Sequence, residues 1–175
     1  MVGTRIALMA VISIALVQPV WGGHTLTLQE QKILDAWLAG HQEYRLATDG
    51  DCDCAEDIQQ MKKGYGGNWR PVPDYHPYVA TGDFNSDGAT DFAFVVIERA
   101  KSIHNFTLLV FNGPFGSKTA APAFVESGLD LRHEGLGFGP PRPKPYRLLM
   151  GPFESDNTAI LVTQGRTYKR QVNED

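Results

Sequence analysis

The sequence lacks the features that mark nucleic-acid-binding and membrane proteins. Its 175 residues carry 16 Lys and Arg against 20 Asp and Glu, a formal net charge of −4, and the basic residues form no patch. We therefore expect no nucleic-acid partner. After residue 22 the chain has no long apolar run, so we expect no membrane association in the remainder.

Motifs of common catalytic sites are also missing. The sequence contains no HExxH, no nucleophile elbow and no phosphate-binding glycine loop. Its histidines are scattered without the spacing of metal ligands: His24, His41, His76, His104 and His133. We therefore predict a protein that is not an enzyme. The alternative is a small secreted hydrolase that uses His133 and Glu134, or His76 in the DYHPY segment, for acid–base chemistry.

Residues 1–22 have the pattern of a secretory signal peptide. Arg5 is their only basic residue, residues 6–17 form an apolar core, and small or tolerated side chains precede a cleavage point at Gly22. The apolar core is too short for a comfortable membrane span. We expect a periplasmic or secreted protein in which residues 23–175 form a single domain; a buried first helix is the alternative explanation.

Cysteine is scarce, and the two cysteines, Cys52 and Cys54, are separated by one residue. In an exported protein an even number of cysteines favours a disulfide. A bond between these two would close a very small ring, which stabilises little through loop closure. The alternatives are two thiols, with Cys54 acting as a small buried hydrophobe, or a redox or metal role. The sequence leaves all three open.

The most specific pattern that is present is TGDFNSDGATDF, residues 81–92. Oxygen-bearing side chains occupy positions one, three, five and nine of a short loop: Asp83, Asn85, Asp87 and Asp91. With Gly88 at position six, this is the D-x-[DN]-x-[DN]-G arrangement of calcium-binding loops. Ala89 at position seven would offer its backbone carbonyl. We therefore predict a calcium site that includes Ala89 and these four side chains.

The alternative explanation for the pattern is a simple turn. Asn, Asp and Gly are common in turns, and Asp87-Gly88 is a hairpin signal in its own right. A turn, however, does not require several carboxylates directed at one another, and without a cation they would repel. The flanks, residues 78–81 and 92–97, are aromatic and β-branched, as strands are. An EF-hand would instead carry Glu at position twelve, where this chain has Phe94.

The segment resembles the calcium loops of FG-GAP and VCBS-type repeats, known from integrin α-type β-propellers and many secreted bacterial proteins. Their pattern, GDFNGDGxxD followed by an apolar strand, matches residues 82–88 together with Asp91 and Phe92. The resemblance implies calcium ligation by four side chains: Asp83, Asn85, Asp87 and Asp91. The chain has no second copy of the pattern, and residues 94–97 do not lead into the glycine-rich ending of a propeller repeat. We therefore expect the calcium site without the propeller.

The remaining sequence predicts an α+β domain. Thr27 to Glu30 forms a capping box before a first helix, which Gly40 ends or loosens and which could resume at residues 44–46. Asp53 is a plausible N-cap of a second helix that ends at Gly64. Strands are predicted at residues 78–83, 91–98, 105–111, 146–150, 158–163 and 166–170. We expect an antiparallel sheet of about five to six strands, with the two N-terminal helices packed on one face.

The longest irregular segment is predicted at residues 127–145. It contains Arg132, His133 and Glu134 in a row, followed by Phe138 among glycines. A loop of this length is usually functional or mobile, so one interpretation is a recognition loop for a protein or glycan partner. The other is a solvated connector. The predicted function is therefore an exported, calcium-stabilised binding module, such as an inhibitor or accessory protein.

Overall fold

The computed structural model describes residues 26–64, 71–116, 120–138, 147–153 and 158–172. Their secondary structure comprises α1 (Leu28–Gly40), β1 (Tyr44–Leu46), the 3-10 helix η1 (Asp49–Asp51), α2 (Ala55–Lys63), β2 (Val79–Gly82), β3 (Asp91–Glu98), β4 (Phe106–Phe111), β5 (Phe124–Leu129), β6 (Glu134–Phe138), β7 (Leu148–Pro152), β8 (Ala159–Gln164) and β9 (Thr167–Val172). The predicted signal peptide, residues 1–22, lies outside the described residues. Within these residues, no helix has both the length and the apolar character needed to cross a membrane.

The strands form two antiparallel sheets, where the sequence predicted one. In the first sheet, β1 and β2 both pair with β3, which is followed by β4 and β5. The second sheet has the order β6-β7-β8-β9. The α+β class and the antiparallel pairing are confirmed, while the number of sheets differs from the prediction.

Strands β3 and β4 form the centre of the first sheet. Their sequences, DFAFVVIE and FTLLVF, consist mainly of the aromatic and β-branched residues that favour strands. Every residue of β4 is buried, and so is every residue of β3 before Glu98. Both faces of these strands are therefore covered. Fully burying one phenylalanine side chain contributes about 1.5–3 kcal/mol.

One face of the first sheet packs against α1. The residues of this interface form one buried cluster: Ile33, Leu34, Phe92, Phe94, Val96, Leu109 and Phe111. The predicted capping box is present at the start of the helix. The Glu30 N–H donates to the Thr27 hydroxyl, and the Thr27 N–H donates to the Glu30 carboxylate at 2.7 Å. The cap therefore starts the helix where its apolar stripe can meet the sheet.

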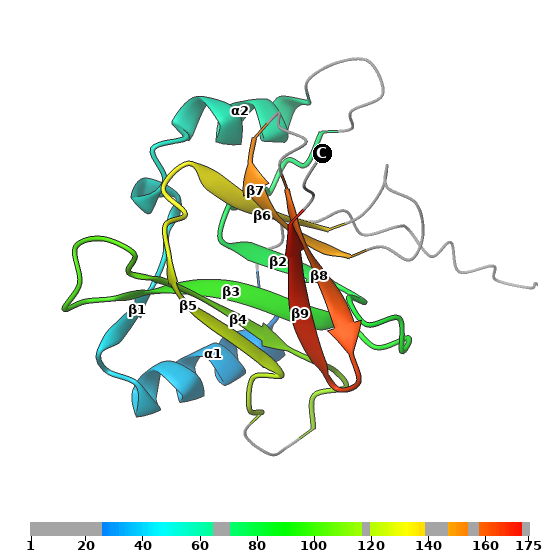
Figure 1. The fold of residues 1–175 in the computed structure, drawn as a ribbon. Helices are drawn as coiled ribbons and strands as arrows, with labels where there is room; N and C mark the ends of the chain where they lie inside the picture. Colours follow the sequence, from blue (N-terminus) through cyan, green and yellow to red (C-terminus); the bar gives the residue numbers. More distant parts are fainter. Residues whose placement is uncertain (1–25, 65–70, 117–119, 139–146, 154–157, 173–175) are drawn as a thin grey trace, which may run out of the picture.

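The opposite face packs against α2 and the second sheet. Its cluster includes Ala93, Val95 and Ile97 of β3, together with Ile58 of α2 and residues of β6, β7 and β8. Because successive strand residues point to opposite faces, α1 and α2 cover opposite sides of the first sheet (Figure 1). This corrects the prediction that both helices pack on one face. The reason is β1, which lies along the edge of β3 between the two helices and carries the chain from one side to the other.

Two further local predictions were wrong. Residues 44–46 do not continue the first helix but form β1, because pairing with residues 96–98 of β3 satisfies their backbone groups. The second helix begins at Ala55 with Cys54 as its N-cap, one residue later than Asp53 would place it, and Cys54 makes no side-chain capping hydrogen bond.

The predicted irregular segment at 127–145 contains regular structure. Strand β5 extends to Leu129, and β6 occupies Glu134–Phe138, while residues 139–145 lie outside the described residues. The glycines and charged residues of FVESGL and EGLGF have low strand propensity, so these strands were not recognised from the sequence. Pairing with β4 and with β7 overrides that local preference.

Side chains of the second sheet contact the first sheet at the β5 edge and at the end of β2. At the β5 edge, Arg170 of β9 forms an ion pair with Glu126 at 3.2 Å. At the end of β2, the Phe138 ring of β6 packs against Phe84, with ring centroids 5.1 Å apart. A Cβ atom on Gly82 would lie 2.1 Å from the Phe138 ring, so only glycine allows this approach. The segment that follows Gly82 therefore lies at the junction of the two sheets.

Candidate metal centre

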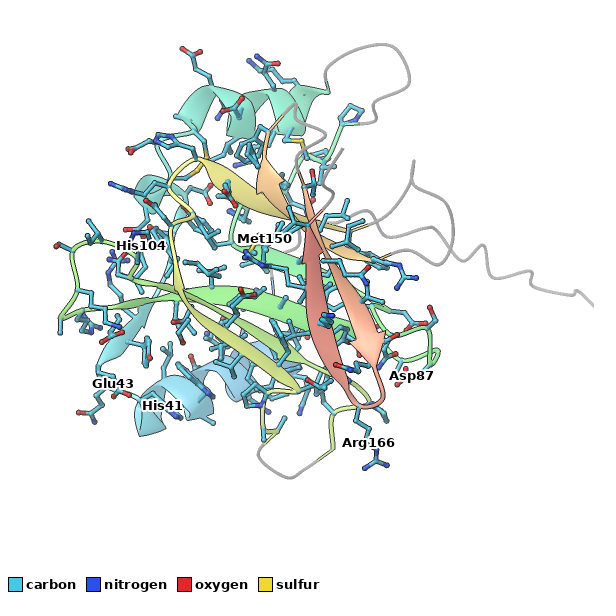
Figure 2. The ribbon with its side chains drawn as sticks, in the orientation of Figure 1. His41, Glu43, Asp87, His104, Met150 and Arg166 are labelled. Atoms are coloured by element: carbon cyan, nitrogen blue, oxygen red, sulfur yellow. A yellow bond between two sulfur atoms is a disulfide. The ribbon has the colours of Figure 1, made fainter. Side chains whose placement is uncertain are left out.

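The predicted calcium loop connects β2 to β3. Gly82 pairs with Asp91 at its base, so the two strands hold the ends of the loop side by side. Gly88 has a φ of 85°, a conformation that glycine adopts without strain. Asp87 is exposed, and Figure 2 labels it at the periphery of the molecule. The strand–loop–strand arrangement predicted from the sequence is confirmed, and the tip of the loop is open to solvent.

The side chains at positions one, three and five of the loop converge. Asp83 Oδ1 and Asn85 Oδ1 both accept the backbone N–H of Asp87, at 3.0 and 2.9 Å. Asp83 Oδ2 accepts the N–H of Gly88 at 2.9 Å. The Asn85 amide donates to Asp87 Oδ2 at 3.0 Å. Two carboxylates and one amide carbonyl are thus gathered around one turn of the loop.

These groups are of the type that calcium binds. Calcium takes six to eight oxygen ligands from carboxylates, amide and backbone carbonyls and water. The Ala89 N–H donates to Asp87 Oδ1 at 2.8 Å, which holds position seven beside the converging side chains. Within the described residues, no three His, Cys, Asp or Glu side chains form a group that could hold a metal. A calcium site at the loop would therefore depend on the Asn85 amide and backbone oxygens, and it stays a prediction.

Asp91, at position nine, has a different environment. Its side chain is fully buried, whereas Asp83 and Asn85 are half-buried. Asp91 Oδ2 accepts the N–H groups of Phe84 and Asn85 at 2.9 and 3.3 Å, and Oδ1 accepts the Gly113 N–H at 2.9 Å. Burial raises the pKa of the Asp91 carboxyl, although these hydrogen bonds act in the opposite direction. The Asp91 carboxylate therefore holds the backbone of the loop, at Phe84 and Asn85, next to that of Gly113.

Two residues far away in the sequence complete the surroundings of Asp91. The hydroxyl of Tyr168 on β9 donates to Asn112 Oδ1 at 2.6 Å and lies 3.4 Å from Asp91 Oδ2. Burial and the nearby negative charge of Asp91 raise the pKa of Tyr168. Tyr168, Asn112 and Gly113 were not identified from the sequence. They follow Asp91 by 77, 21 and 22 residues, so no local sequence signal connects them to it.

The acidic side chains of the loop have no cationic partner in the described parts of the chain. The ion pairs there involve other carboxylates, namely those of Asp49, Asp51, Glu98, Glu126 and Asp130. Within the described residues, the charges of Asp83 and Asp87 are met only by N–H groups of the loop. Carboxylates held close together repel one another, so a bound cation would lower the energy of this arrangement.

The structure joins Cys52 and Cys54 in a disulfide, the first of the three alternatives left open by the sequence. Both residues are buried, and the Cys52 sulfur lies 4.0 Å from the Glu134 carbonyl of β6. The Asp53 N–H between them donates to the Arg132 carbonyl at 2.7 Å. The disulfide thus closes a small ring before α2, and the Asp53–Arg132 hydrogen bond connects this ring to the turn between β5 and β6.

The histidines of the hydrolase alternative lie in different settings. His76 Nδ1 is 2.8 Å from Asp49 Oδ1, and Lys62 Nζ is 3.5 Å from the other oxygen of Asp49. His133 is exposed, and burial raises the pKa of Glu134. Among the described side chains, no hydrogen bond joins His76 to His133 or Glu134. Asp49, the partner of His76, and Lys62, which pairs with Asp49, were not identified from the sequence.

Comparison with protein-family models, with curated proteins and with solved structures found no match to this chain.

Proposed function

We propose that this chain is an exported, calcium-stabilised module that binds a protein or glycan partner and does not itself catalyse a reaction. One observation carries the calcium part of the proposal. The oxygens of Asp83, Asn85 and Asp87 are gathered in one turn, and no cationic side chain of the described residues balances them. Other acidic residues of the same chain are balanced by Arg or Lys.

Asp83, Asn85 and Asp87 would hold the ion through their side chains, and Ala89 through its backbone carbonyl. When bound, calcium supplies the positive charge that these ligands lack. The chain itself determines what such an ion would stabilise. Phe84, inside the loop, packs on Phe138 of β6, so fixing the loop would also fix a contact between the two sheets. The expected role is therefore structural.

Part of the proposed partner surface is the turn between β5 and β6. Arg132 and His133 are exposed there, and the Arg132 guanidinium is held by hydrogen bonds to Asp130. The disulfide region supports this turn through the Asp53–Arg132 backbone hydrogen bond. A firmly held turn with an exposed cation and imidazole suits recognition of a polar partner, because little conformational entropy is lost on binding.

Thermal denaturation with and without calcium tests the calcium part. Saturating calcium is expected to raise the Tm by about 5–10 °C over the protein in chelator, since a ligand at a hundred times its Kd adds about 2.7 kcal/mol. Asp87→Ala should remove this response. The control is Asp35→Asn, which removes an exposed carboxylate on α1 and should retain it. Equal Tm values for the wild type in calcium and in chelator would contradict the proposal.

The partner part requires a separate test. The immobilised protein is expected to retain a defined protein or glycan from extracellular or periplasmic extracts in the presence of calcium. A double variant, Arg132→Ala with His133→Ala, should lose this retention while keeping the wild-type calcium response. If the same molecule binds the double variant equally well, the turn between β5 and β6 is not the partner surface.

A further inference from the structure

The most deeply buried acidic group of the structure is the Asp91 carboxylate, which has no exposed surface. Three backbone N–H groups from two separate segments point at it. Those of Phe84 and Asn85 belong to the loop, and that of Gly113 belongs to the connection after β4. A buried carboxylate with several N–H donors is a strong structural anchor, because each donor would be left unsatisfied without it.

The hydrogen bonds of Asp91 leave little capacity for a metal ion. Oδ2 accepts two N–H groups and has the Tyr168 hydroxyl 3.4 Å away, so its lone pairs are already engaged. Oδ1 accepts the Gly113 N–H in a site closed to solvent. The carboxylate differs in this respect from those of Asp83 and Asp87, which lie in the open part of the loop. Its position nevertheless controls the loop, because it fixes the backbone on either side of the Phe84–Asn85 peptide.

The same carboxylate connects the loop to the second sheet. The Tyr168 hydroxyl of β9 donates to Asn112 Oδ1 and lies 3.4 Å from Asp91 Oδ2, and its ring packs against Phe124 of β5. A Cβ atom on Gly113 would lie 2.4 Å from the Thr90 carbonyl, so the connection after β4 also fits closely against the loop. A change in the loop backbone would therefore alter the contact between Asp91 and Tyr168 of β9.

We propose that Asp91 is a positioning residue of the calcium loop, not one of its ligands, and that through Gly113 and Tyr168 it couples calcium binding to the packing of β9. The coupling rests on the calcium function proposed above. It is reciprocal: if calcium stabilises the contact with β9, then loosening that contact must weaken calcium binding by the same factor. This departs from the ligand role that the resemblance to FG-GAP loops implies for position nine.

Hydrogen exchange of the calcium-free protein tests the positioning role. Asp91→Asn replaces one acceptor oxygen with an NH₂ group that faces N–H donors. The amides of Phe84, Asn85 and Gly113, and those of β9, are expected to exchange at least about tenfold faster than in the wild type. The matched control is Asp83→Asn, the same replacement at a predicted ligand. It should abolish calcium binding and leave the exchange of Gly113 and β9 unchanged.

Calcium titration of a second pair of variants tests the coupling, even if Asp91→Asn does not fold. Tyr168→Phe removes only a hydroxyl and is expected to weaken calcium binding about fivefold, the effect of one lost hydrogen bond. Tyr78→Phe is the control, because Tyr78 is equally buried and its hydroxyl bonds to the Leu131 carbonyl instead. It should leave calcium binding unchanged.

The outcomes separate this proposal from the calcium function. If calcium-free Asp91→Asn exchanges like the wild type, Asp91 does not position the loop. If Tyr168→Phe binds calcium as tightly as Tyr78→Phe, there is no coupling to β9. If the wild type binds no calcium at all, the proposed function and the coupling both fail, whereas the exchange comparison still decides whether Asp91 positions the loop.

Discussion

Two segments of this molecule contain acidic residues at alternating positions, and they are stabilised in opposite ways. In the first, residues 49–53, the carboxylates of Asp49 and Asp51 pair with basic side chains of the chain. Arg45 donates to Asp51 at 2.8 Å. Asp49 is shared by Lys62 and His76. In the second segment, residues 83–87 of the predicted calcium loop, the carboxylates accept only N–H groups among the described residues.

The comparison teaches that alternating carboxylates do not by themselves indicate a metal site. In the first segment, Asp51 is the third residue of η1 and its carboxylate caps Thr48 through the backbone N–H and the hydroxyl. The partner side chains Arg45, Lys62 and His76 come from β1, α2 and the connection before β2, so they meet the carboxylates only in the folded chain. What distinguishes the calcium loop is the glycine at position six and the absence of such cations among the described residues.

The largest expected difference is in the unfolding free energy lost when a glycine of each acidic region, Gly82 or Gly50, is replaced by alanine. Gly82→Ala would drive a Cβ atom into the Phe138 ring and should cost about 1–3 kcal/mol of unfolding free energy, as overpacking does. Gly50→Ala meets nothing closer than the Thr48 hydroxyl at 3.8 Å and should cost less than about 0.5 kcal/mol. Urea denaturation of both variants measures this. Equal costs would show that the calcium loop is not wedged between the sheets.

The next largest effect is on the stability that the Arg45–Asp51 pair contributes, which depends on pH. Hydrogen bonds from Arg45 lower the pKa of Asp51 to about 2, although partial burial opposes them. A carboxyl with a lower pKa in the folded than in the unfolded chain stabilises the fold above about pH 4 and loses that effect as the pH falls toward 2. Asp51→Asn should therefore cost about 1 kcal/mol at pH 7, a figure reduced because Arg45 is more than one-third exposed.

Denaturation at two pH values checks this prediction. At pH 3 the cost of Asp51→Asn should fall to about half its value at pH 7. The calcium response of the variant should match that of the wild type, because Asp51 lies outside the calcium loop and pairs with Arg45 of β1. A cost that is the same at both pH values would mean that the ion pair does not account for the stabilisation.

The smallest expected effect comes from giving the calcium loop a cation of its own. Thr90 is exposed at the end of the loop, so Thr90→Lys places an ammonium group near Asp83 and Asp87 without disturbing the core. Calcium binding should weaken about threefold, since solvent screens much of the added charge. Thr90→Gln is the control of similar length. Equal calcium affinities for the two variants would indicate that the charge balance of the loop does not determine its calcium affinity.

Local features of the fold could be predicted from the sequence. The Thr27–Glu30 capping box, the β2–β3 hairpin and the apolar strands β3 and β4 were recognised because their signals lie within a few residues of one another. The convergence of the loop side chains was predicted for the same reason, whereas calcium binding stays a prediction. The structure confirms that Asp83, Asn85 and Asp87 come together, as their alternate spacing predicted.

Features that depend on distant partners could not be predicted. Strands β5 and β6 have low intrinsic propensity and form because β4 and β7 pair with them. The two helices are separated by β1, a three-residue strand whose pairing partners lie 50 to 54 residues later in the chain. Asp91 looks like a fourth ligand in the sequence, and only the folded chain brings Gly113 and Tyr168 to its carboxylate.

The most direct test of the account is the number of calcium ions bound by each chain, measured by native mass spectrometry or equilibrium dialysis. The account predicts one ion for the wild type and for Asp51→Asn, and none when Asp83 and Asp87 are both replaced by Asn. A wild-type chain that binds no calcium, or a double variant that still binds one ion, would contradict it.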